Sequence, residues 1–454
     1  MELNLDNINK IFFIGIGGIS MSGLAKLLHA EGKNVLGSDL LKTEQTKSLK
    51  KSGVKVFYGH KKSHIKNCDL VVYSGAISNE NSELMESFRQ GIPVIERSQL
   101  LSLVSKRYKN VIAISGTHGK TTTTAMIAYI FSLCGLNPTV HVGGYFEHIN
   151  GNVLIGGNEY FITEACEFRD SFLTLHPHIS VINNIEKEHL DYFKTFSNEV
   201  NSFKKFACQT TQKCFVNIGC SRYIKNESII TFGKNEKSDY RAENIKQDTD
   251  GKYIFDCYNK NVYIGRFKLS IFGRHNIDNA LATIAVCIEC NVDYNIIRLG
   301  LKTFKNAKRR FELIGKYKNN IVIHDYAHHP TEIEKTLKTC RDAYKKKIIC
   351  VFQPHTFSRT KTLIEKFSKC FKGIDELLLV KTYSAREKYD YLGSAEYLRE
   401  KILQNSADLS VPNVFNKKQT LKFIKQQNFC DGIILFLGAG DIENLAYKLT
   451  KKRQ

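Results

Sequence analysis

The sequence has few of the features that mark disordered, exported or membrane-spanning proteins. Only six of its 454 residues are proline and 42% are hydrophobic, which is typical of a folded globular protein. The opening MELNLDNINK carries acids where a secretory signal needs a basic start. No apolar run reaches the roughly 18 residues that a membrane span requires. We therefore expect a cytoplasmic protein that has no membrane partner.

Metal-binding and disulfide patterns are also lacking. The thirteen cysteines follow no disulfide framework, so we expect reduced thiols. Cys287 and Cys290 have the spacing of a zinc-ligand pair, but they lie in the helix-like run NALATIAVCIEC without a second pair. His324 and His328 have the spacing of a helical zinc site, yet the run before them is strand-like and we expect the helix to begin only at Pro330. No zinc site is expected.

Positive charge is the one bulk property that suggests a nucleic-acid partner. The chain has 66 lysines and arginines against 45 acids, a formal net charge of +21. The lysines occur in short runs along the whole length, without the interleaved aromatic residues of a single-strand binding surface. We therefore expect no nucleic acid among its partners, although a nucleic-acid-binding NTPase remains an alternative.

Alternating strand-like and helix-like runs predict an α/β protein with three domains in series. We expect a Rossmann-like N-terminal domain over residues 1–107. A central domain of the P-loop ATPase type is expected over residues 108–306, and a Rossmann-like C-terminal domain over residues 307–454. Ligands are expected in clefts at the carboxyl ends of the parallel strands.

The segment GIGGIS near the start forms a predicted turn between a strand and a helix. Gly15, Gly17 and Gly18 lie in this turn, where backbone amides at a helix N-terminus can hold a phosphate. Ser20 stands where a dinucleotide fingerprint has its third glycine, and Asp39 closes the next strand as a ribose-binding acid would. An NAD-dependent oxidoreductase is thus an open alternative for this segment alone.

A second glycine loop, GTHGKTTTT, follows the strand-like VIAIS and precedes a long helix-like run. This is the setting of a phosphate-binding loop, in which Lys120 neutralises phosphates and Thr121 holds magnesium. The loop lacks the first glycine of the usual eight-residue pattern, because Ile114 takes that place. The sequence therefore predicts a nucleoside triphosphate site with an incomplete motif.

Acids follow two later strand-like runs of the central domain. After YFIT and ISVINNI come Glu164, Glu167, Asp170, Glu188, His189 and Asp191. Magnesium prefers hard oxygen ligands beside a nucleotide, so we predict a metal site among these residues.

Polar residues also follow the strand-like runs of the third domain. They are Asp325, His328, His329, His355, Arg359 and Arg386. Several cations at strand ends of one domain favour a face that handles anions, where they could orient a carboxylate or an ammonium group.

Taken together, these segments are similar to the Mur ligase family. The resemblance covers nearly the whole chain and is carried by GIGGISMSGLA, SGTHGKTTTT, EACEFRDSF, NIEKEHLDYF, GRHNIDNALA, KRRFE, HDYAHHPTE, VFQPHTFSRT, YSARE and LGAGD. The order and the opening motif resemble the members that join L-alanine to UDP-N-acetylmuramate in peptidoglycan precursor synthesis. A member that joins an intact peptide to the same sugar nucleotide is the nearest alternative.

The resemblance implies an ATP- and Mg²⁺-dependent ligase that acts through an acyl phosphate and releases ADP and phosphate. The first domain would bind the UDP-sugar acid, the second ATP and the third the amino acid. We expect a monomer or weak homodimer whose other partners are small molecules.

The resemblance also implies roles for individual residues. Lys120 and Thr121 would contact ATP phosphates and Mg²⁺, while Glu167 and His189 would hold metal at the reacting carboxylate. Further ATP-binding residues would be Gly116, Thr117, His118, Gly119, Thr122, Asn276, Asn279 and either Arg309 or Arg310. The UDP-sugar residues would be Gly15, Gly17, Gly18, Ser20 and Asp39. Asp325 and His328 would act in catalysis, and the alanine pocket would comprise Tyr326, His328, His355 and Arg359.

The chain departs from the family pattern at four positions. Cys166 and Arg169 replace two acids of the common E-A-D-E-S-D segment, Glu188 replaces an aspartate before His189, and His324 stands where an aspartate is common. Roles of the acids that Cys166 and Arg169 replace therefore do not transfer, whereas Glu188 is a longer carboxylate that can still serve the metal.

Overall fold

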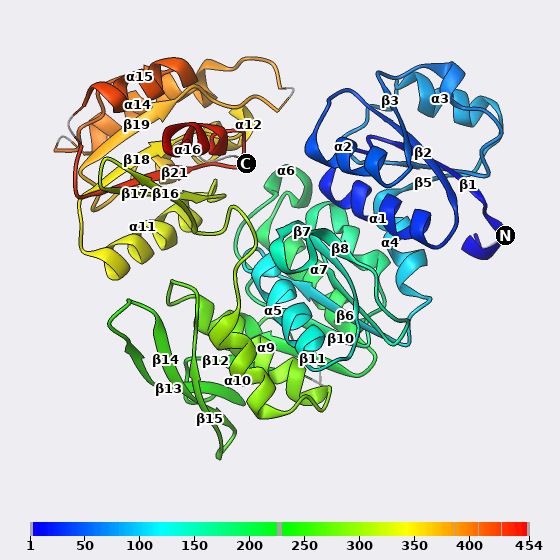
Figure 1. Ribbon diagram of the computed structural model, residues 1–454, viewed down its shortest axis with the longest axis horizontal. Helices are drawn as coiled ribbons and strands as arrows, with labels where there is room; N and C mark the ends of the chain where they lie inside the picture. The colour runs from blue at the N-terminus through cyan, green and yellow to red at the C-terminus, as the bar shows by residue number, and fades with distance from the viewer. Residues whose placement is uncertain (1–2, 225–228, 386, 407, 428, 452–454) are drawn as a thin grey trace. The chain divides into compact units, whose positions relative to one another are not determined.

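The computed structural model describes residues 3–224, 229–385, 387–406, 408–427 and 429–451, and Figure 1 shows their ribbon. The chain divides into two compact units. Unit 1 comprises Met1–Asn244, Phe255–Phe267 and Asp278–Ala307, and unit 2 comprises Ile245–Ile254, Lys268–Ile277 and Lys308–Gln454. Within the described ranges, no helix has the length and hydropathy needed to cross a membrane.

The N-terminal sheet has five parallel strands in the order β3-β2-β1-β4-β5. The strands are β1 (Lys10–Ile14), β2 (Asn34–Asp39), β3 (Lys55–Tyr58), β4 (Leu70–Tyr73) and β5 (Val94–Glu96), and the helices are α1 (Ile19–Ala30), α2 (Glu44–Lys51), α3 (Ser82–Arg89) and α4 (Arg97–Ser105). Phe12 and Phe13 are both fully buried, as expected for a central strand covered on both faces. The predicted Rossmann-like arrangement is confirmed, and its strand order reverses between β1 and β4, beside the GIGGIS turn.

The central sheet has ten strands in the order β15-β14-β13-β12-β11-β10-β6-β9-β7-β8. They are β6 (Asn110–Ser115), β7 (Thr139–Phe146), β8 (Gly151–Leu154), β9 (Tyr160–Glu164), β10 (Ile179–Ile182), β11 (Lys213–Asn217), β12 (Ile229–Gly233), β13 (Tyr240–Gln247), β14 (Tyr253–Asn259) and β15 (Val262–Lys268). The helices are α5 (Lys120–Leu133), α6 (Leu190–Phe193), α7 (Phe196–Cys208), α8 (Ile218–Ser221), α9 (Asn276–Glu289) and α10 (Tyr294–Thr303). Strand β6 is parallel to its neighbours β10 and β9, so the loops that follow all three strands meet at one edge.

The C-terminal sheet has six strands in the order β16-β17-β21-β18-β19-β20, all parallel except β16. They are β16 (Glu312–Tyr317), β17 (Asn320–Asp325), β18 (Ile348–Phe352), β19 (Glu376–Val380), β20 (Val414–Phe415) and β21 (Ile433–Leu437). The helices are α11 (Pro330–Tyr344), α12 (Phe357–Thr362), α13 (Ile364–Phe367), α14 (Ala395–Asn405), α15 (Lys417–Gln426) and α16 (Glu443–Thr450). Helix α11 begins at Pro330 as predicted, after the strand that carries His324.

Short 3-10 helices complete the chain: η1 (Leu5–Asn7), η2 (Lys62–His64), η3 (Glu147–Ile149), η4 (Phe168–Thr174) and η5 (Tyr391–Gly393). Segment η4 matters for the site, because Glu167 immediately precedes it.

Candidate active site

The second glycine loop connects β6 to α5 through a backbone that only glycine accommodates. Gly119 has φ +84°, and a Cβ there would lie 2.5 Å from Asn279 Oδ1 and 3.1 Å from Asn183 Nδ2. Helix α5 begins directly afterwards at Lys120, without a side-chain cap. The loop therefore brings backbone amides and a lysine to the same helix start, which is how phosphate-binding loops are built.

Lys120 is held at this helix start by acceptors on the loop and by one acid. Its Nζ donates to the carbonyl oxygens of Gly116 at 2.5 Å and Thr117 at 3.2 Å. It also lies 3.0 and 3.1 Å from the two oxygens of the buried Glu167 carboxylate. Burial alone would lower the pKa of Lys120, but Glu167, Cys166 and Glu188 together outweigh burial, so the pKa is raised. The lysine remains a cation.

The segment after β10 fixes the shape of the loop. Asn184 accepts the amide of Thr117 with its carbonyl oxygen at 3.1 Å and the amide of His118 with its side chain at 2.8 Å. In return, Thr117 Oγ1 accepts the amide of Glu186 at 2.9 Å. This interlock joins the loop to the turn that carries the candidate metal ligands.

The first turn of α5 is also held by residues of α9 and of the segment that follows α10. Thr123 donates to Asn279 Oδ1 at 3.3 Å, and Thr122 donates to Asn306 Oδ1 at 3.2 Å. Asn279 thus lies against the loop, whereas Asn276 donates to the Phe272 carbonyl oxygen at 2.6 Å within unit 2. Thr121 occupies the second position of α5, beside Lys120.

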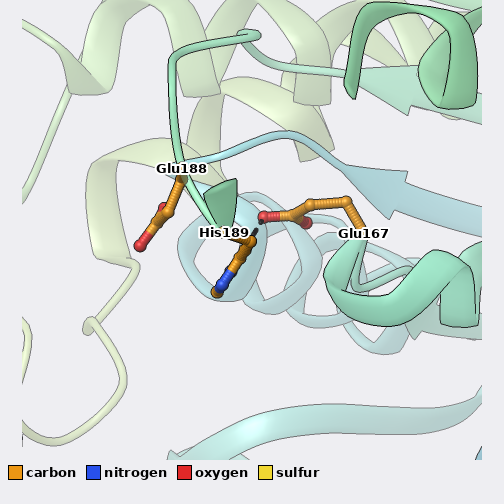
Figure 2. Close-up of side chains that lie close together, drawn as sticks. All are labelled: Glu167, Glu188 and His189. Atoms are coloured by element: carbon orange, nitrogen blue, oxygen red, sulfur yellow. Dashed lines mark ion pairs between the residues drawn. The ribbon is translucent and has the colours of Figure 1, made fainter. Parts of the chain in front are cut away.

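Among the described residues, one group of acids and histidines has the geometry of a metal site. Ligand atoms of Glu167, Glu188 and His189 all lie within 4.8 Å of one another. Figure 2 shows that Glu167 approaches from one segment, while Glu188 and His189 come from a single turn. Two carboxylates suit a hard cation such as Mg²⁺, whose remaining positions phosphate oxygens and water can fill.

His189 is held in an unusual backbone conformation. Its φ is +54°, in the left-handed backbone region that residues other than glycine seldom adopt. Its ring lies 4.7 Å from the Phe168 ring, and its Nε2 is 4.0 Å from Glu167 Oε1. Such conformations persist only where surrounding contacts enforce them, and they concentrate at functional sites.

The other predicted acids serve different purposes. Glu164 accepts the amide of Gly143 at 2.6 Å, and Asp170 accepts from the hydroxyls of Tyr192 and Ser202. Neither belongs to the metal-like group, which draws Glu167 from the first predicted set of acids and Glu188 and His189 from the second. The side chain of Asp191 and the whole of Arg386 lie outside the described residues.

The first glycine loop is shaped by Asp39 rather than by a cation. Asp39 Oδ2 accepts the Gly17 amide at 2.9 Å and Oδ1 accepts the Leu41 amide at 3.0 Å. Helix α1 starts after Gly18 without a side-chain cap. Ser20, in its first turn, lies 3.1 Å from His141 Nε2 and accepts from Arg97 at 3.3 Å.

The residues predicted for the third domain gather within unit 2. The His328 and His355 rings are 6.0 Å apart, and Arg359 donates to the His355 carbonyl oxygen at 2.9 Å. The Tyr326 ring lies 5.1 Å from that of His328. Burial lowers the pKa of His328 to about 3 and that of His355 to about 4, so both imidazoles are neutral near pH 7.

The two candidate arginines have different surroundings. Arg309 forms an ion pair with Glu443 at 2.7 Å and donates to the Gly440 carbonyl oxygen at 2.6 Å. Both arginines also lie over the Tyr326 ring, at 4.7 Å for Arg309 and 5.2 Å for Arg310. The nearby Asp325 accepts the amides of Phe311 and Ala327 at 2.7 and 2.8 Å, which makes it an organiser of this strand end.

A phosphate loop at the end of a central parallel strand, a buried lysine–glutamate pair and an adjacent acid–histidine group together define a nucleotide-dependent phosphoryl-transfer enzyme. Three family models match successive parts of the chain: "Mur ligase family, catalytic domain" over residues 10–109, "Mur ligase middle domain" over 114–287 and "Mur ligase, glutamate ligase domain" over 309–440. The chain belongs to the Mur ligase family.

Its similar relatives include two curated bacterial UDP-N-acetylmuramate–L-alanine ligases. The protein of Caldanaerobacter subterraneus subsp. tengcongensis is 41% identical, with 100% of both chains covered. The protein of Caldicellulosiruptor saccharolyticus is 42% identical, with 96% of this chain and 97% of the relative covered.

Solved structures agree with the fold. The UDP-N-acetylmuramate-alanine ligase of Thermotoga maritima has 27% identity and a TM-score of 0.83, covering 97% of this chain and 98% of that chain. A murein peptide ligase of Psychrobacter arcticus has 23% identity and a TM-score of 0.73, with 98% of each chain covered. The full-length relationship removes the NAD-dependent oxidoreductase and the nucleic-acid-binding NTPase as alternatives.

Proposed function

We propose that this protein is the ATP-dependent ligase that joins L-alanine to the lactyl carboxylate of UDP-N-acetylmuramate, releasing ADP and phosphate in peptidoglycan precursor synthesis. The observation that carries the proposal is the Lys120–Glu167 pair at the start of α5, beside Glu188 and His189. It occurs in a chain that is 41% identical over its full length to a ligase of that name.

The chemistry requires charge neutralisation more than acid–base catalysis. A carboxylate is a poor electrophile, and transfer of a phosphoryl group makes it an acyl phosphate that an amine can attack. Lys120, already held at the loop by the Gly116 and Thr117 carbonyl oxygens, is placed to spread the negative charge that develops on the transferred group. The amine of L-alanine then displaces phosphate and forms the amide.

Thr121, Glu167, Glu188 and His189 would hold Mg²⁺. A cation held there would supply positive charge that neutralises the phosphates. Asn279, which braces Thr123, would lie near the nucleotide together with Asn276.

The UDP-sugar acid is assigned to the first domain. Gly15, Gly17, Gly18 and Ser20 supply the uncapped start of α1 for its diphosphate, and Asp39 keeps that loop in shape.

The amino acid is assigned to Tyr326, His328, His355 and Arg359. Arg359 suits the carboxylate of alanine, and the neutral histidines suit its ammonium group. Arg309 or Arg310, which both lie over the Tyr326 ring, is assigned to the phosphate contact.

The proposal also includes domains that end at residues 107 and 306. It further includes a cytoplasmic location and a monomeric or weakly dimeric state.

One assay tests the function. Phosphate release is measured with ATP and UDP-N-acetylmuramate, with L-alanine or with the tripeptide of the recycling ligases as acceptor. The proposal expects release that depends on L-alanine and formation of a UDP-N-acetylmuramoyl-alanine product. Preference for the tripeptide would reassign the chain to the peptide-joining members, and turnover independent of any acceptor would reject both.

A further inference from the structure

Glu199 is a buried acid that the proposed mechanism does not use. It lies in the first turns of α7, and its side chain is fully buried. Burying a carboxyl group without full hydrogen bonding costs several kcal/mol. Its neighbours Val200 and Phe203 on the same helix are apolar members of the core, so an apolar side chain would satisfy packing here.

One oxygen of Glu199 reaches the turn that carries two candidate metal ligands. Its Oε2 accepts the backbone amide of Glu188 at 3.3 Å, while its Oε1 has no hydrogen-bond partner among the described residues. Glu188 is directly followed by His189, the residue held at φ +54°. A contact at this amide therefore holds the residue that directly precedes the left-handed position.

The electrostatic surroundings place Glu199 beside the same centre. The pKa of Glu199 is raised to about 8, chiefly by burial and also by the carboxylates of Glu167 and Glu188, while the hydrogen bond from the Glu188 amide and the charge of Lys120 oppose the rise. Glu199 thus lies within electrostatic range of the phosphate-loop lysine and of both candidate metal carboxylates.

Helix α7 gives Glu199 a fixed base. Thr195 caps the helix by accepting the Asn198 amide at 3.2 Å, and Phe203 and Phe206 are fully buried against the core. Because the helix is fixed in this way, Glu199 can hold the Glu188–His189 turn, which belongs to no helix or strand.

We infer that Glu199 is a positioning residue that fixes the Glu188–His189 turn for divalent-cation binding, through the hydrogen bond that its carboxyl oxygen accepts from the Glu188 amide. This inference rests on the proposed metal site. It predicts that an oxygen acceptor at residue 199 is required, whereas a negative charge there is not.

The test is Mn²⁺ binding to the full-length protein without nucleotide, followed by electron paramagnetic resonance of the free ion. Glu199→Leu removes the acceptor, and affinity is expected to fall about tenfold, the lower end of the range for losing an outer-sphere contact at a metal site. Glu199→Gln keeps an oxygen acceptor without the charge, and its affinity is expected to stay within about threefold of the parent protein.

Two further variants keep the result interpretable. Val200→Ala removes apolar core packing from the same helix and leaves Glu199 in place, so Mn²⁺ affinity should not change. If Glu199→Leu does not fold, Glu199→Asp withdraws the oxygen by one methylene and should give the same loss.

The inference is overturned if the folded Leu variant, or the Asp variant in its place, binds Mn²⁺ normally, or if Gln binds no better than Leu. Glu167→Gln separates the two proposals: unchanged Mn²⁺ affinity in that variant would reject the metal site itself, whereas a loss there with normal binding by the Glu199 variants would reject only the positioning role.

Discussion

The two glycine loops of unit 1 have the same local plan but opposite charge arrangements. Each follows a parallel strand and starts a helix without a side-chain cap. In the first loop an acid, Asp39, accepts a loop amide, whereas in the second a cation, Lys120, donates to loop carbonyl oxygens and to Glu167. The first suits a diphosphate that is bound unchanged, and the second suits a phosphoryl group whose charge moves during reaction.

Removing the cation of the second loop should have the largest effect. Lys120→Ala is expected to lower ATP-dependent phosphate release by a thousandfold or more, on the order of 4 kcal/mol of transition-state stabilisation, while the protein stays folded. Lys109→Ala is the control, because that lysine is exposed and its ammonium group pairs with Glu159 at the surface. Near-normal ligation by Lys120→Ala in a folded protein would mean that the two loops do not differ as described.

The second-largest effect is expected when a single methyl group is added to the second loop. Gly119→Ala forces a Cβ to within 2.5 Å of Asn279 Oδ1 at φ +84°. ATP affinity should fall about a hundredfold, because the loop must move away from the helix start. Gly135→Ala is a matched control with φ +79° and no atom within 4 Å, so it carries the backbone strain alone. Isothermal titration with ATP separates them, and equal losses would show that strain, not crowding, governs the loop.

The sequence predicted these loops because each combines glycine spacing with a clear strand and helix on either side. It also predicted Glu167 and His189, which follow strands at the same sheet edge as the loop. It did not single out Glu199, because one acid in a helix does not show whether it faces solvent or the core. The antiparallel additions to the central sheet, β14 and β15, were also missed, since their short alternating runs are far weaker than the buried parallel strands.

Some predicted residues make contacts that the sequence did not indicate. Asp39 was predicted as a ribose-binding acid, and in the structure its two oxygens accept the amides of Gly17 and Leu41. Glu164 and Asp170 likewise hold neighbouring segments instead of joining the metal-like group. A strand-end position is readable from sequence, but the partner of a carboxylate depends on which backbone amides the fold turns toward it.

A third variant tests the role of the acid in the first loop. Asp39→Ala removes two accepted hydrogen bonds, so the KM for UDP-N-acetylmuramate is expected to rise about tenfold while the KM for ATP stays unchanged. Asp69→Ala is the control, since Asp69 also accepts two amides, from Asn9 and Lys10, at the opposite end of β1. Steady-state kinetics with each substrate varied would contradict the assignment if both KM values rose together.

Lowering the pH should protonate His141, which contacts Ser20 after the first loop, whereas Lys120 of the second loop is already a cation. Burial, assisted by the nearby Arg97, lowers the pKa of His141 to about 4, and its Nε2 lies 3.1 Å from Ser20 Oγ. The folded pKa lies below the unfolded value of about 6.5, so the unfolded state binds more protons and the contribution of His141 to stability declines as pH falls from about 6.5 to about 4. The free energy of unfolding should change by on the order of 1 kcal/mol per pH unit at most.

Urea unfolding of the parent protein and of His141→Val at pH 7, 6 and 5 measures this dependence of stability on pH. The variant should lose less stability on acidification, even if it is less stable at pH 7 because Ser20 and Thr163 lose a partner. Parallel slopes would show that His141 does not give this loop its sensitivity to acid, and the electrostatic contrast between the two loops would then rest on Asp39 and Lys120.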